Sequence, residues 1–585
     1  MSSEPHKVKA DGYGDSVIKH FQNLRTENEL CDFKVLAQGR VFEVHRALLA
    51  ATSDYFRVMF KGVMAESRQD TVDLKGVSAD GLQQVIDFIY SGEMSLSDEN
   101  LTEVINTASH LQVASAIDVC SSYIKSLLTF ENYEELLSIA DTYSLESVVV
   151  HWENMIHERF MEFTGTQAFL KMDGDKLARH LLQNSLRVPS EYQLFVSLDK
   201  WFRFQATRLA QDSAKLLSNI RFGLMSEQEL TAIRDTDSIK RCPVGQQLIA
   251  KGYHYHMDSK KGHPSIDEHC KVRADEAAIV MVHLGTSHMP FQITAFNPTT
   301  KLFYCLFSDV NGIRDCRVAS VDNFAYICRV VDFGGGTLMS SLFRFDPRHL
   351  IGQELRPMRR LRLEFACVSH TRCLYAFGGT TEQFTILDSV ECYNVQSNTW
   401  DELQPLPAPT HSLAAVSHGS KIYLSGGISG QDRTIVASFF SYDPVTRRYE
   451  PKPSMFYARR LHDMIAFKNQ IFALGGISRQ GIPLYGQIPI ERFDMVTNQW
   501  TMLSSTLGGR SVGHYMFLDE GQILSLGHEH HSATEEEMWL YMPDSDSWSK
   551  YSKAPHRMSL NSALCMQLYI NFFQEKVSSK VMKDK

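Results

Sequence analysis

Hydrophobic and polar residues follow different periods in different parts of the chain. Near the N-terminus, Val17, Phe21 and Leu24 recur at i, i+4 and i+7, the spacing of one apolar helix face. Alternating runs around Gly39 then predict a hairpin, and helical spacing dominates from about residue 82 to residue 230. Beyond residue 272 short apolar strands replace the helical pattern. The pattern predicts a mixed α/β start, a helical middle and an all-β end.

The all-β part contains an internal repeat. Three apolar strands end in Gly-Gly at 378/379, 426/427 and 475/476, and Trp400, Tyr449 and Trp500 follow at matching intervals. Weaker copies on both sides bring the number of units to six, each of about 50 residues. A period near 50 with four short strands per unit is typical of a propeller. We expect each Gly-Gly to end an inner strand that crowds the central axis, each aromatic residue to end a third strand and pack between blades, and residues 558–573 to complete the first blade.

Composition narrows the classes of protein. The net charge of -9 argues against a protein that binds nucleic acid in bulk. The 11 cysteines are scattered without a C-x-x-C pair, which is typical of reduced thiols. The polar start does not resemble a signal peptide, and the apolar runs are far shorter than the ~20 residues of a membrane helix. We expect a cytoplasmic protein with no membrane partner and no cofactor; cytoskeletal association or a partial nuclear pool are alternatives.

Motifs in the N-terminal part carry a family resemblance. The segment 30–60, LCDFKVLAQGRVFEVHRALLAATSDYFRVMF, contains three groups typical of a BTB domain: Leu30-Cys31-Asp32, Phe42 with His45-Arg46, and Ser53 with Tyr55-Phe56. The segment 190–208, SEYQLFVSLDKWFRFQATR, resembles part of a BACK domain. With the kelch-type repeat, the chain resembles the BTB–BACK–kelch family over nearly its full length.

The resemblance implies a multidomain fold with an α/β BTB domain, an all-α BACK domain and an all-β six-bladed kelch propeller. The boundaries we expect are a BTB domain with an N-terminal dimerisation helix over 1–128, a BACK domain that includes a 3-box over 129–257, a linker over 258–274, the propeller over 275–575, and a disordered tail over 576–585.

Family members of this type are similar to substrate adaptors of cullin-3 ubiquitin ligases. The BTB domain dimerises and docks the cullin, while the propeller holds a protein substrate, so the chain itself would catalyse nothing. A ligase-independent scaffold, actin-associated or regulatory, is the main alternative. A copper oxidase would need Tyr, His and Cys ligands at the axis, and a transcription factor would need zinc-finger spacing; neither pattern is evident.

Four residues are implied as cullin contacts. Family adaptors carry a φ-x-E motif after the third BTB helix, which here would be Met64-Ala65-Glu66. The apolar side chain would fill a small pocket and the carboxylate would accept charge-assisted hydrogen bonds; a solvated turn is the alternative. The 3-box would span 122–143 and include Leu128 and Tyr133. Tyr133 stands where the family commonly has a cysteine, and its larger ring could fill a groove that the cullin would use.

A second group is expected at a dimer interface. Val17, Phe21 and Leu24 would form an apolar face that packs across a two-fold axis, although packing within one chain is the alternative. In this family the aspartate at Asp32 is a buried polar residue near that interface. Because an unpaired buried charge is costly, we expect it to pair with a basic side chain.

The substrate-binding candidates lie in the propeller. Four arginines recur at a similar distance before a strand that ends in glycine or before the closing strand: Arg362, Arg459, Arg510 and Arg557. Blade 4 has Thr410 at the equivalent position. In this family such a ring would meet acidic or phosphorylated peptides at the mouth; bracing loops against backbone carbonyls is the equal alternative. Variable loops offer Phe384, Arg433 and Tyr485 as anchors. We interpret the histidine-rich stretch 527–537 as a solvated loop and not as a metal site.

Overall fold

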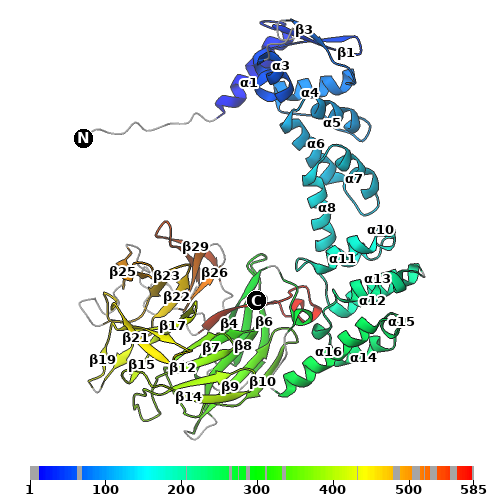
Figure 1. The fold of residues 1–585 in the computed structure, drawn as a ribbon. Helices are drawn as coiled ribbons and strands as arrows, with labels where there is room; N and C mark the ends of the chain where they lie inside the picture. The colour runs from blue at the N-terminus through cyan, green and yellow to red at the C-terminus, as the bar shows by residue number, and fades with distance from the viewer. Residues whose placement is uncertain are drawn as a thin grey trace, which may run out of the picture. The chain divides into compact units, whose positions relative to one another are not determined.

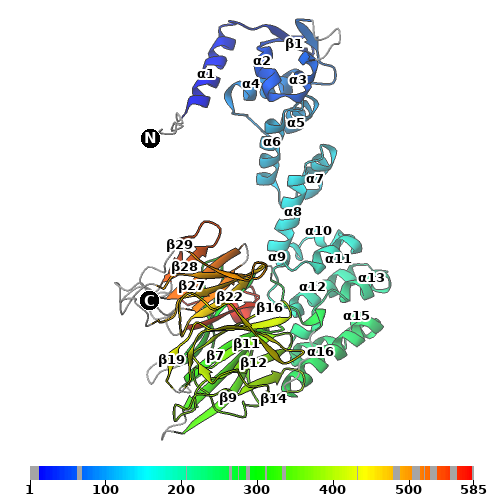
Figure 2. The same cartoon turned by 60° about the vertical axis from the view of Figure 1, so that its left-hand side comes forward.

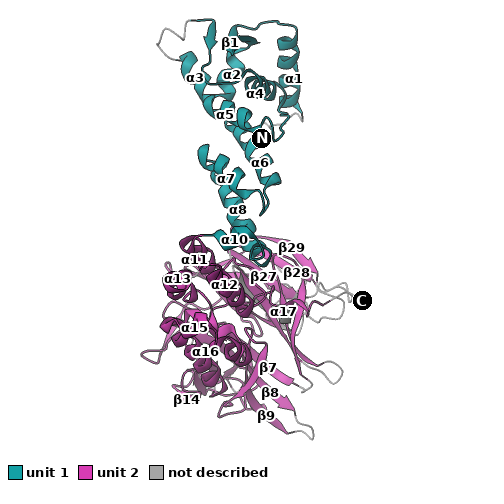
Figure 3. Ribbon diagram, turned by 90° about the vertical axis from the view of Figure 1, so that its right-hand side faces the viewer, with its two compact units in different colours: residues 1–172 teal, residues 173–585 magenta. Residues whose placement is uncertain are grey.

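The computed structural model describes two compact units, residues 1–172 and 173–585 (Figure 3). The described residues are 12–61, 69–205, 207–261, 267–274, 276–284, 290–309, 313–332, 337–430, 432–478, 488–503, 514–518, 521–527, 537–553 and 563–582.

Unit 1 begins with the expected α/β domain (Figure 1). Its three-stranded sheet has the order β2-β1-β3, and β1 alternates buried and exposed positions as the sequence pattern predicts. The predicted hairpin between β1 and β2 is confirmed, with Gly39 in the left-handed region at φ 79°. The elements are α1 (Tyr13–Thr26), β1 (Phe33–Ala37), β2 (Arg40–Val44), α2 (Arg46–Thr52), α3 (Asp54–Lys61), β3 (Thr71–Asp73), α4 (Ala79–Ser91), α5 (Leu101–His110) and α6 (Ala114–Leu127).

Unit 1 continues into a helical region held by aromatic packing. The rings of Phe130, Trp152, Phe163 and Phe169 contact one another in sequence at centroid distances of 5.7, 6.2 and 5.8 Å. Edge-to-face pairs of this kind add stability beyond the apolar area that they bury. The helices are α7 (Tyr133–Thr142), α8 (Glu146–Glu158), α9 (Phe160–Phe163) and α10 (Gln167–Lys171).

Unit 2 begins with further helices. They are α11 (Gly174–Leu182), α12 (Glu191–Phe204), α13 (Arg208–Leu217), η2 (Phe222–Leu224), α14 (Glu227–Arg234), α15 (Asp237–Lys240), α16 (Pro243–Lys261) and η3 (Glu268–Cys270). The helical pattern expected up to residue 257 is therefore present, and it is divided between the two units.

The expected linker over 258–274 is instead packed, in its described part, against the rest of unit 2. Residues up to Lys261 belong to α16, and Cys270 and Arg273 are buried. The Arg273 guanidinium pairs with Glu191 at 2.6 Å and donates to the carbonyl of Leu181 at 2.6 Å. The polar composition of this segment reflects an internal ion pair as well as exposure to solvent.

Six four-stranded antiparallel sheets form the propeller blades (Figures 1 and 2). Six hydrophobic clusters each join two neighbouring blades, the last joining blade 6 to blade 1, so the ring is closed. The residues 558–573 were expected to complete the first blade, and β30 does so by pairing with β4.

The blade strands are as follows. Blade 1 contains β30 (Ala563–Tyr569), β4 (Ala277–His283), β5 (Phe291–Phe296) and β6 (Phe303–Asp309); blade 2 contains β7 (Ile313–Val321), β8 (Phe324–Asp332), β9 (Leu338–Asp346) and β10 (Ile351–Leu355); blade 3 contains β11 (Ala366–His370), β12 (Cys373–Phe377), β13 (Val390–Asn394) and β14 (Thr399–Leu403). Blade 4 contains β16 (Ala414–His418), β17 (Lys421–Ser425), β20 (Phe439–Asp443) and β21 (Arg448–Lys452), with the short strands β15 (Thr410–His411), β18 (Ile428–Ser429) and β19 (Thr434–Ile435) beside it; blade 5 contains β22 (Asp463–Phe467), β23 (Gln470–Leu474), β24 (Glu491–Asp494) and β25 (Gln499–Met502); blade 6 contains β26 (His514–Leu518), β27 (Gln522–Gly527), β28 (Glu537–Met542) and β29 (Ser547–Lys553).

Two details of the repeat differ from expectation. Gly378 follows the second strand of its blade and not the strand nearest the propeller axis. A side chain is excluded there by the segment that enters blade 4, because an added Cβ would lie 2.1 Å from the carbonyl oxygen of Thr410. Trp400 does pack between blades 2 and 3, but it stands on the fourth strand of its blade and not the third.

The C-terminal tail is ordered as far as residue 582, contrary to the expectation for 576–585. The short helix α17 (Glu575–Ser578) buries Val577 in the cluster between blades 1 and 2. Lys580 then accepts a backbone hydrogen bond from Cys305 at 3.0 Å, and Met582 donates to Phe303 at 2.8 Å. The tail thus lies along β6 as an additional edge.

No helix in the described parts of the chain is long and apolar enough to cross a membrane.

Candidate protein-interaction surfaces

The helix α1 presents an apolar face that the described residues of unit 1 cover only in part. None of its residues is buried, and Val17 is 36% exposed. One side of the helix is fixed to unit 1, because the Phe21 ring packs edge-on against His45 at 5.3 Å and Arg25 pairs with Asp87 at 2.8 Å. Leu24 is half-buried. Packing within one chain therefore covers part of the apolar face of α1, and a dimer contact through the rest of that face stays a prediction.

Asp32 has a structural role and is exposed in the single chain, so its expected burial near a dimer interface stays a prediction. Its Oδ1 accepts a hydrogen bond from the backbone N–H of Arg46 at 2.7 Å, at the start of α2. A carboxylate is favourable at a helix N-terminus because it satisfies a free N–H and meets the positive end of the helix dipole. The Arg46 side chain pairs with Asp70 at 3.0 Å instead.

The predicted cullin contacts fall in different surroundings. Met64 and Glu66 follow α3 in the sequence and lie outside the described residues. Leu128 is only 6% exposed, so the structure corrects the expectation that its side chain meets a partner. It belongs to the core at the end of α6.

Tyr133 lies flat on Trp152 of α8. The ring centroids are 4.8 Å apart and the rings are within 2° of parallel. The hydroxyl donates to Glu134 at 3.0 Å, and burial, aided by that carboxylate, raises the pKa of Tyr133 to about 12. The tyrosine ring at position 133 therefore covers the indole of Trp152 within unit 1.

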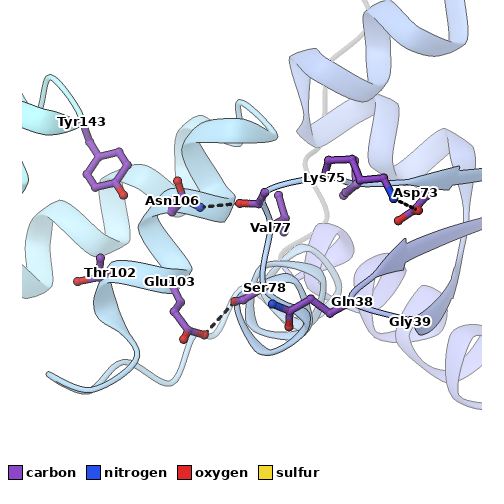
Figure 4. Close-up of a pocket in the computed structure, with 12 residues that line it drawn as sticks. Gln38, Gly39, Asp73, Lys75, Val77, Ser78, Thr102, Glu103, Asn106 and Tyr143 are labelled. Carbon is purple, nitrogen blue, oxygen red and sulfur yellow. Dashed lines mark hydrogen bonds and ion pairs between the residues drawn. The ribbon is translucent and has the colours of Figure 1, made fainter.

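A cavity of about 560 Å³ lies between the β1–β2 turn, the segment that follows β3, α5 and the end of α7 (Figure 4). Two hydrogen bonds shape it: Ser78 donates to Glu103 at 2.9 Å, and Asn106 donates to the carbonyl of Gly76 at 3.1 Å. Tyr143, the last residue of the expected 3-box, lines its far side. The cavity was not predicted from the sequence, because its walls come from four separate segments.

Arg362 and Arg459 are braces inside their blades. Both side chains are 0% exposed. The Arg362 guanidinium donates to the carbonyls of Gly378 at 2.8 Å and Ser389 at 2.9 Å, and it pairs with Glu391 at 2.6 Å. A ligand cannot contact a guanidinium that has no exposed surface, so the expectation of substrate contact is corrected for Arg362 and Arg459.

The sequence interpretation missed the carboxylate partners of these arginines. Arg459 pairs with Glu491 at 2.6 Å, as Arg362 pairs with Glu391. Each glutamate stands two residues before the aromatic residue of its third strand, Tyr393 or Phe493. That shared position is the signal that could have identified the pairs. Arg510 and Arg557 lie outside the described residues.

Phe384 and Arg433, proposed as anchors, come together at the surface. They belong to the loops after β12 and β17, in neighbouring blades. Phe384 is 67% exposed, and the Arg433 guanidinium donates to its carbonyl at 3.2 Å. Both residues have left-handed backbone conformations, with φ of 59° and 49°, which are uncommon for such side chains and tend to occur at functional sites. Tyr485 lies outside the described residues.

The histidine-rich segment is described only at its ends, Gly527 and Glu537. Over the residues that the structure describes, no group of three or more His, Cys, Asp or Glu side chains could hold a metal ion.

Together, an α/β domain with an uncovered helix, a helical region and a closed propeller define a modular protein-interaction protein. Comparison with family models matches the BTB/POZ domain at residues 21–128, the BTB And C-terminal Kelch domain at 134–235, and the KLHDC2/KLHL20/DRC7 Kelch-repeats domain at 364–572.

Similar proteins match along nearly the whole chain. Kelch-like protein 26 from Danio rerio is 28% identical and covers 92% of this chain and 91% of its own. Kelch-like protein 36 from Rattus norvegicus is 26% identical with 99% and 97% coverage, and Kelch-like protein 15 from Homo sapiens is 26% identical with 93% and 94% coverage. The chain belongs to the BTB–BACK–kelch family, whose members are generally non-catalytic adaptors.

Proposed function

We propose that the protein is the substrate-recognition adaptor of a cullin-3 RING E3 ubiquitin ligase. In this proposal unit 1 binds cullin-3 through the BTB domain and the 3-box, and the propeller binds a protein substrate. The observation that carries the proposal is that one chain contains all three domain types in the adaptor order, with similar proteins matching from end to end.

The mechanism would be proximity. Two binding surfaces on one chain convert the meeting of substrate and ligase into an intramolecular event, which raises the effective concentration of a substrate lysine near the recruited conjugating enzyme. The surfaces described here suit that role, since none of them requires the chain to make or break a bond. We place this activity in the cytoplasm.

Dimerisation would double the arrangement. The uncovered face of α1, including Val17, supports an isologous contact in which each copy presents the same helix. Two propellers could then hold two copies of a substrate or two motifs of one substrate.

The cavity of about 560 Å³ supports a docking surface on unit 1. Its lining joins the BTB domain to Tyr143 at the end of the 3-box, and the φ-x-E motif at Met64–Glu66 would supply a further apolar and acidic contact. A helical partner that meets both regions would bury an anchor at each.

The direct test is binding of the full chain to the cullin-3 N-terminal domain, measured by titration calorimetry. If Met64 and Glu66 are hot spots, M64A/E66A should weaken binding by more than about 2 kcal/mol and leave the oligomeric state unchanged. Val445→Ala, in the β20–β21 turn of the propeller, serves as the control. Wild-type protein that is folded yet does not bind cullin-3 would refute the adaptor proposal.

A ligase-independent scaffold is the second candidate. The stacking of Tyr133 on Trp152 favours it, because a ring in that position could occupy space that a cullin tail would need. Tyr133→Cys separates the two candidates: gain of cullin-3 binding in this variant, from none in the wild type, would support the scaffold.

A further inference from the structure

Blade 4 lacks the buried brace of its two neighbours. In blades 3 and 5 an arginine stands 16 residues before the first glycine and donates to that glycine's carbonyl, from Arg362 to Gly378 and from Arg459 to Gly475. At the same distance before Gly426, blade 4 has Thr410, whose hydroxyl donates to Ala408 at 2.9 Å.

The strand pairing shows that the carboxylate has been exchanged as well. Glu391 pairs with Ala376 across β13 and β12, and Glu491 pairs with Ala473 across β24 and β23. The equivalent pair in blade 4 is Phe440 with Leu424. A phenyl and an isobutyl group therefore occupy the places of a carboxylate and a methyl group.

The backbone donors to that carboxylate have changed in parallel. Glu391 accepts N–H groups from Arg359 at 2.7 Å and Arg360 at 3.2 Å, three and two residues before the bracing arginine, respectively. At the first of these positions blade 4 has Pro407, which carries no N–H. The arginine, the carboxylate and one of the two backbone donors are thus replaced together, so no buried charge is left without a partner.

A cavity of about 150 Å³ lies at this place, between blade 4 and the segment that enters it from blade 3. It is lined mainly by apolar groups of blade 4 and of the segment before it, among them Leu406, Pro407, Leu413, Leu424, Val436 and Phe440. Pro407 and Ala408 are exposed, so the cavity reaches the surface.

Most of the hydroxyl groups in the lining are already engaged. Ser425 hydrogen-bonds with His462 at 2.7 Å, Ser429 donates to the carbonyl of Pro409 at 3.1 Å, and Thr410 is bound as described. The space therefore offers an apolar wall to an incoming group. An apolar cavity of roughly 150 Å³ accommodates one benzene-sized group, and folded cores contain few voids larger than a water molecule.

The rim of the cavity continues into the exposed loops. Ser429 ends β18 and Val436 follows β19, and the hairpin of these two strands carries Arg433 at its turn. Arg433 in turn holds the loop of the exposed Phe384. An apolar pocket beside an exposed aromatic residue and an arginine has the composition typical of an interface hot spot.

We propose that this cavity is the anchor site for one large apolar side chain, of leucine, methionine or phenylalanine size, from a protein partner that lies across the loops of Phe384 and Arg433. The inference rests on the proposed function only in so far as the propeller binds a protein. An arginine from the partner is a poorer fit, because the cavity has lost the carboxylate that neutralises the guanidinium in blades 3 and 5.

The test uses a phage-displayed library of random twelve-residue peptides, selected on the full chain. Enriched peptides should share one large apolar residue. Two variants fill the cavity in different ways: Thr410→Leu adds a larger side chain, and T410R/L424A/F440E restores the three side chains of the brace in blades 3 and 5, although not the N–H that Pro407 lacks. Each should weaken peptide binding about tenfold or more, the value of one buried apolar side chain. Val445→Leu, at a position 88% exposed in the turn of the same blade, leaves the net charge unchanged as both filling variants do; it is the control and should change nothing.

Three results would overturn the anchor: no enrichment, enrichment of arginine, or equal binding by the wild type and a cavity-filling variant that melts at the wild-type temperature. If only one filling variant folds, that variant decides. Cullin-3 binding is measured on the same proteins and separates the two ideas. Loss of peptide binding with cullin binding intact supports the anchor, whereas an absence of cullin binding in every protein refutes the adaptor and leaves the anchor standing.

Discussion

Replacing Arg459 by methionine would leave the Glu491 carboxylate in the interior of blade 5 without its cation. Both side chains are 0% exposed and lie 2.6 Å apart. The same guanidinium also donates to the carbonyls of Gly475 at 3.1 Å and Pro489 at 3.0 Å. Methionine fills a similar length of space and donates to none of these acceptors, so the change isolates the polar contribution of the arginine.

The magnitude follows from burial. Removing one partner of a fully buried pair costs about 3–5 kcal/mol, because the remaining charge keeps its desolvation penalty. Arg360 offers a matched comparison, since its pair with Glu402 at 3.3 Å is about half exposed on both sides. Arg360→Met should cost about 0–1 kcal/mol, the usual value of a surface pair.

A double variant tests whether the leftover charge is the cause. Glu491 also accepts the backbone N–H groups of Phe456 at 2.6 Å and Tyr457 at 3.0 Å. The two N–H groups bind different oxygens of Glu491, so glutamine at 491 removes the charge and keeps an oxygen for one of the two donors. R459M/E491Q should therefore be more stable than R459M by at least about 1 kcal/mol.

Hydrogen exchange of the full chain measures these differences blade by blade. The opening free energy of the β23 and β24 amides should fall in R459M, while the β12 and β13 amides of blade 3 act as an internal standard. A loss below about 1 kcal/mol in R459M, or a double variant less stable than the single one, would refute the assignment of Arg459 as a buried brace.

Three further predictions concern other contacts. Tyr133→Ala should destabilise unit 1 by about 1 kcal/mol more than the loss of buried apolar area alone, and it should change the fluorescence emission of Trp152. Tyr133→Phe should leave the stability and the emission near wild type, because it preserves the stacking at 4.8 Å. The hydrogen bond from His411 lowers the pKa of Glu364 from 4.5 to about 2, so its contribution to stability is complete above pH 4.5 and is lost as the pH falls towards 2; melting curves should show less acid sensitivity over that range in Glu364→Gln than in the wild type. Deleting residues 576–585 should lower the melting temperature of the propeller by several degrees, since the tail buries Val577 and pairs with β6; an unchanged value would restore the interpretation of a disordered tail.

Features with a regular period were predictable from the sequence. The six blades, the closing strand and the β1–β2 hairpin followed from spacing and from glycine positions, because short-range patterns directly reflect strand and turn geometry. The domain types followed from motifs whose residues are close together in the chain.

Features that depend on a distant partner were not predictable in the same way. The segment with Arg273 looks like a linker until Glu191, 82 residues earlier, is placed beside it. Arg362 has the same local sequence whether its guanidinium faces a ligand or Glu391; only the pairing of β12 with β13 decides between them. For Asp32, the motif indicates a polar residue with a structural role. It does not indicate how exposed that residue is in the single chain.

Blade 4 shows why such a position can change its role without disturbing the ring. The backbone at the brace position makes the joint between blades whatever its side chain: the carbonyl of Thr410 accepts the N–H of Gly379 at 3.0 Å, as the carbonyl of Arg459 accepts that of Gly427 at 2.9 Å. Gly378 and Gly426 allow this approach, because a Cβ would come within 2.1 or 2.4 Å of those carbonyl oxygens. The glycines and the backbone therefore hold neighbouring blades together. The side chain at the brace position is left free either to brace its own blade through a carboxylate or, where threonine replaces the arginine and phenylalanine the glutamate, to leave a pocket at the surface.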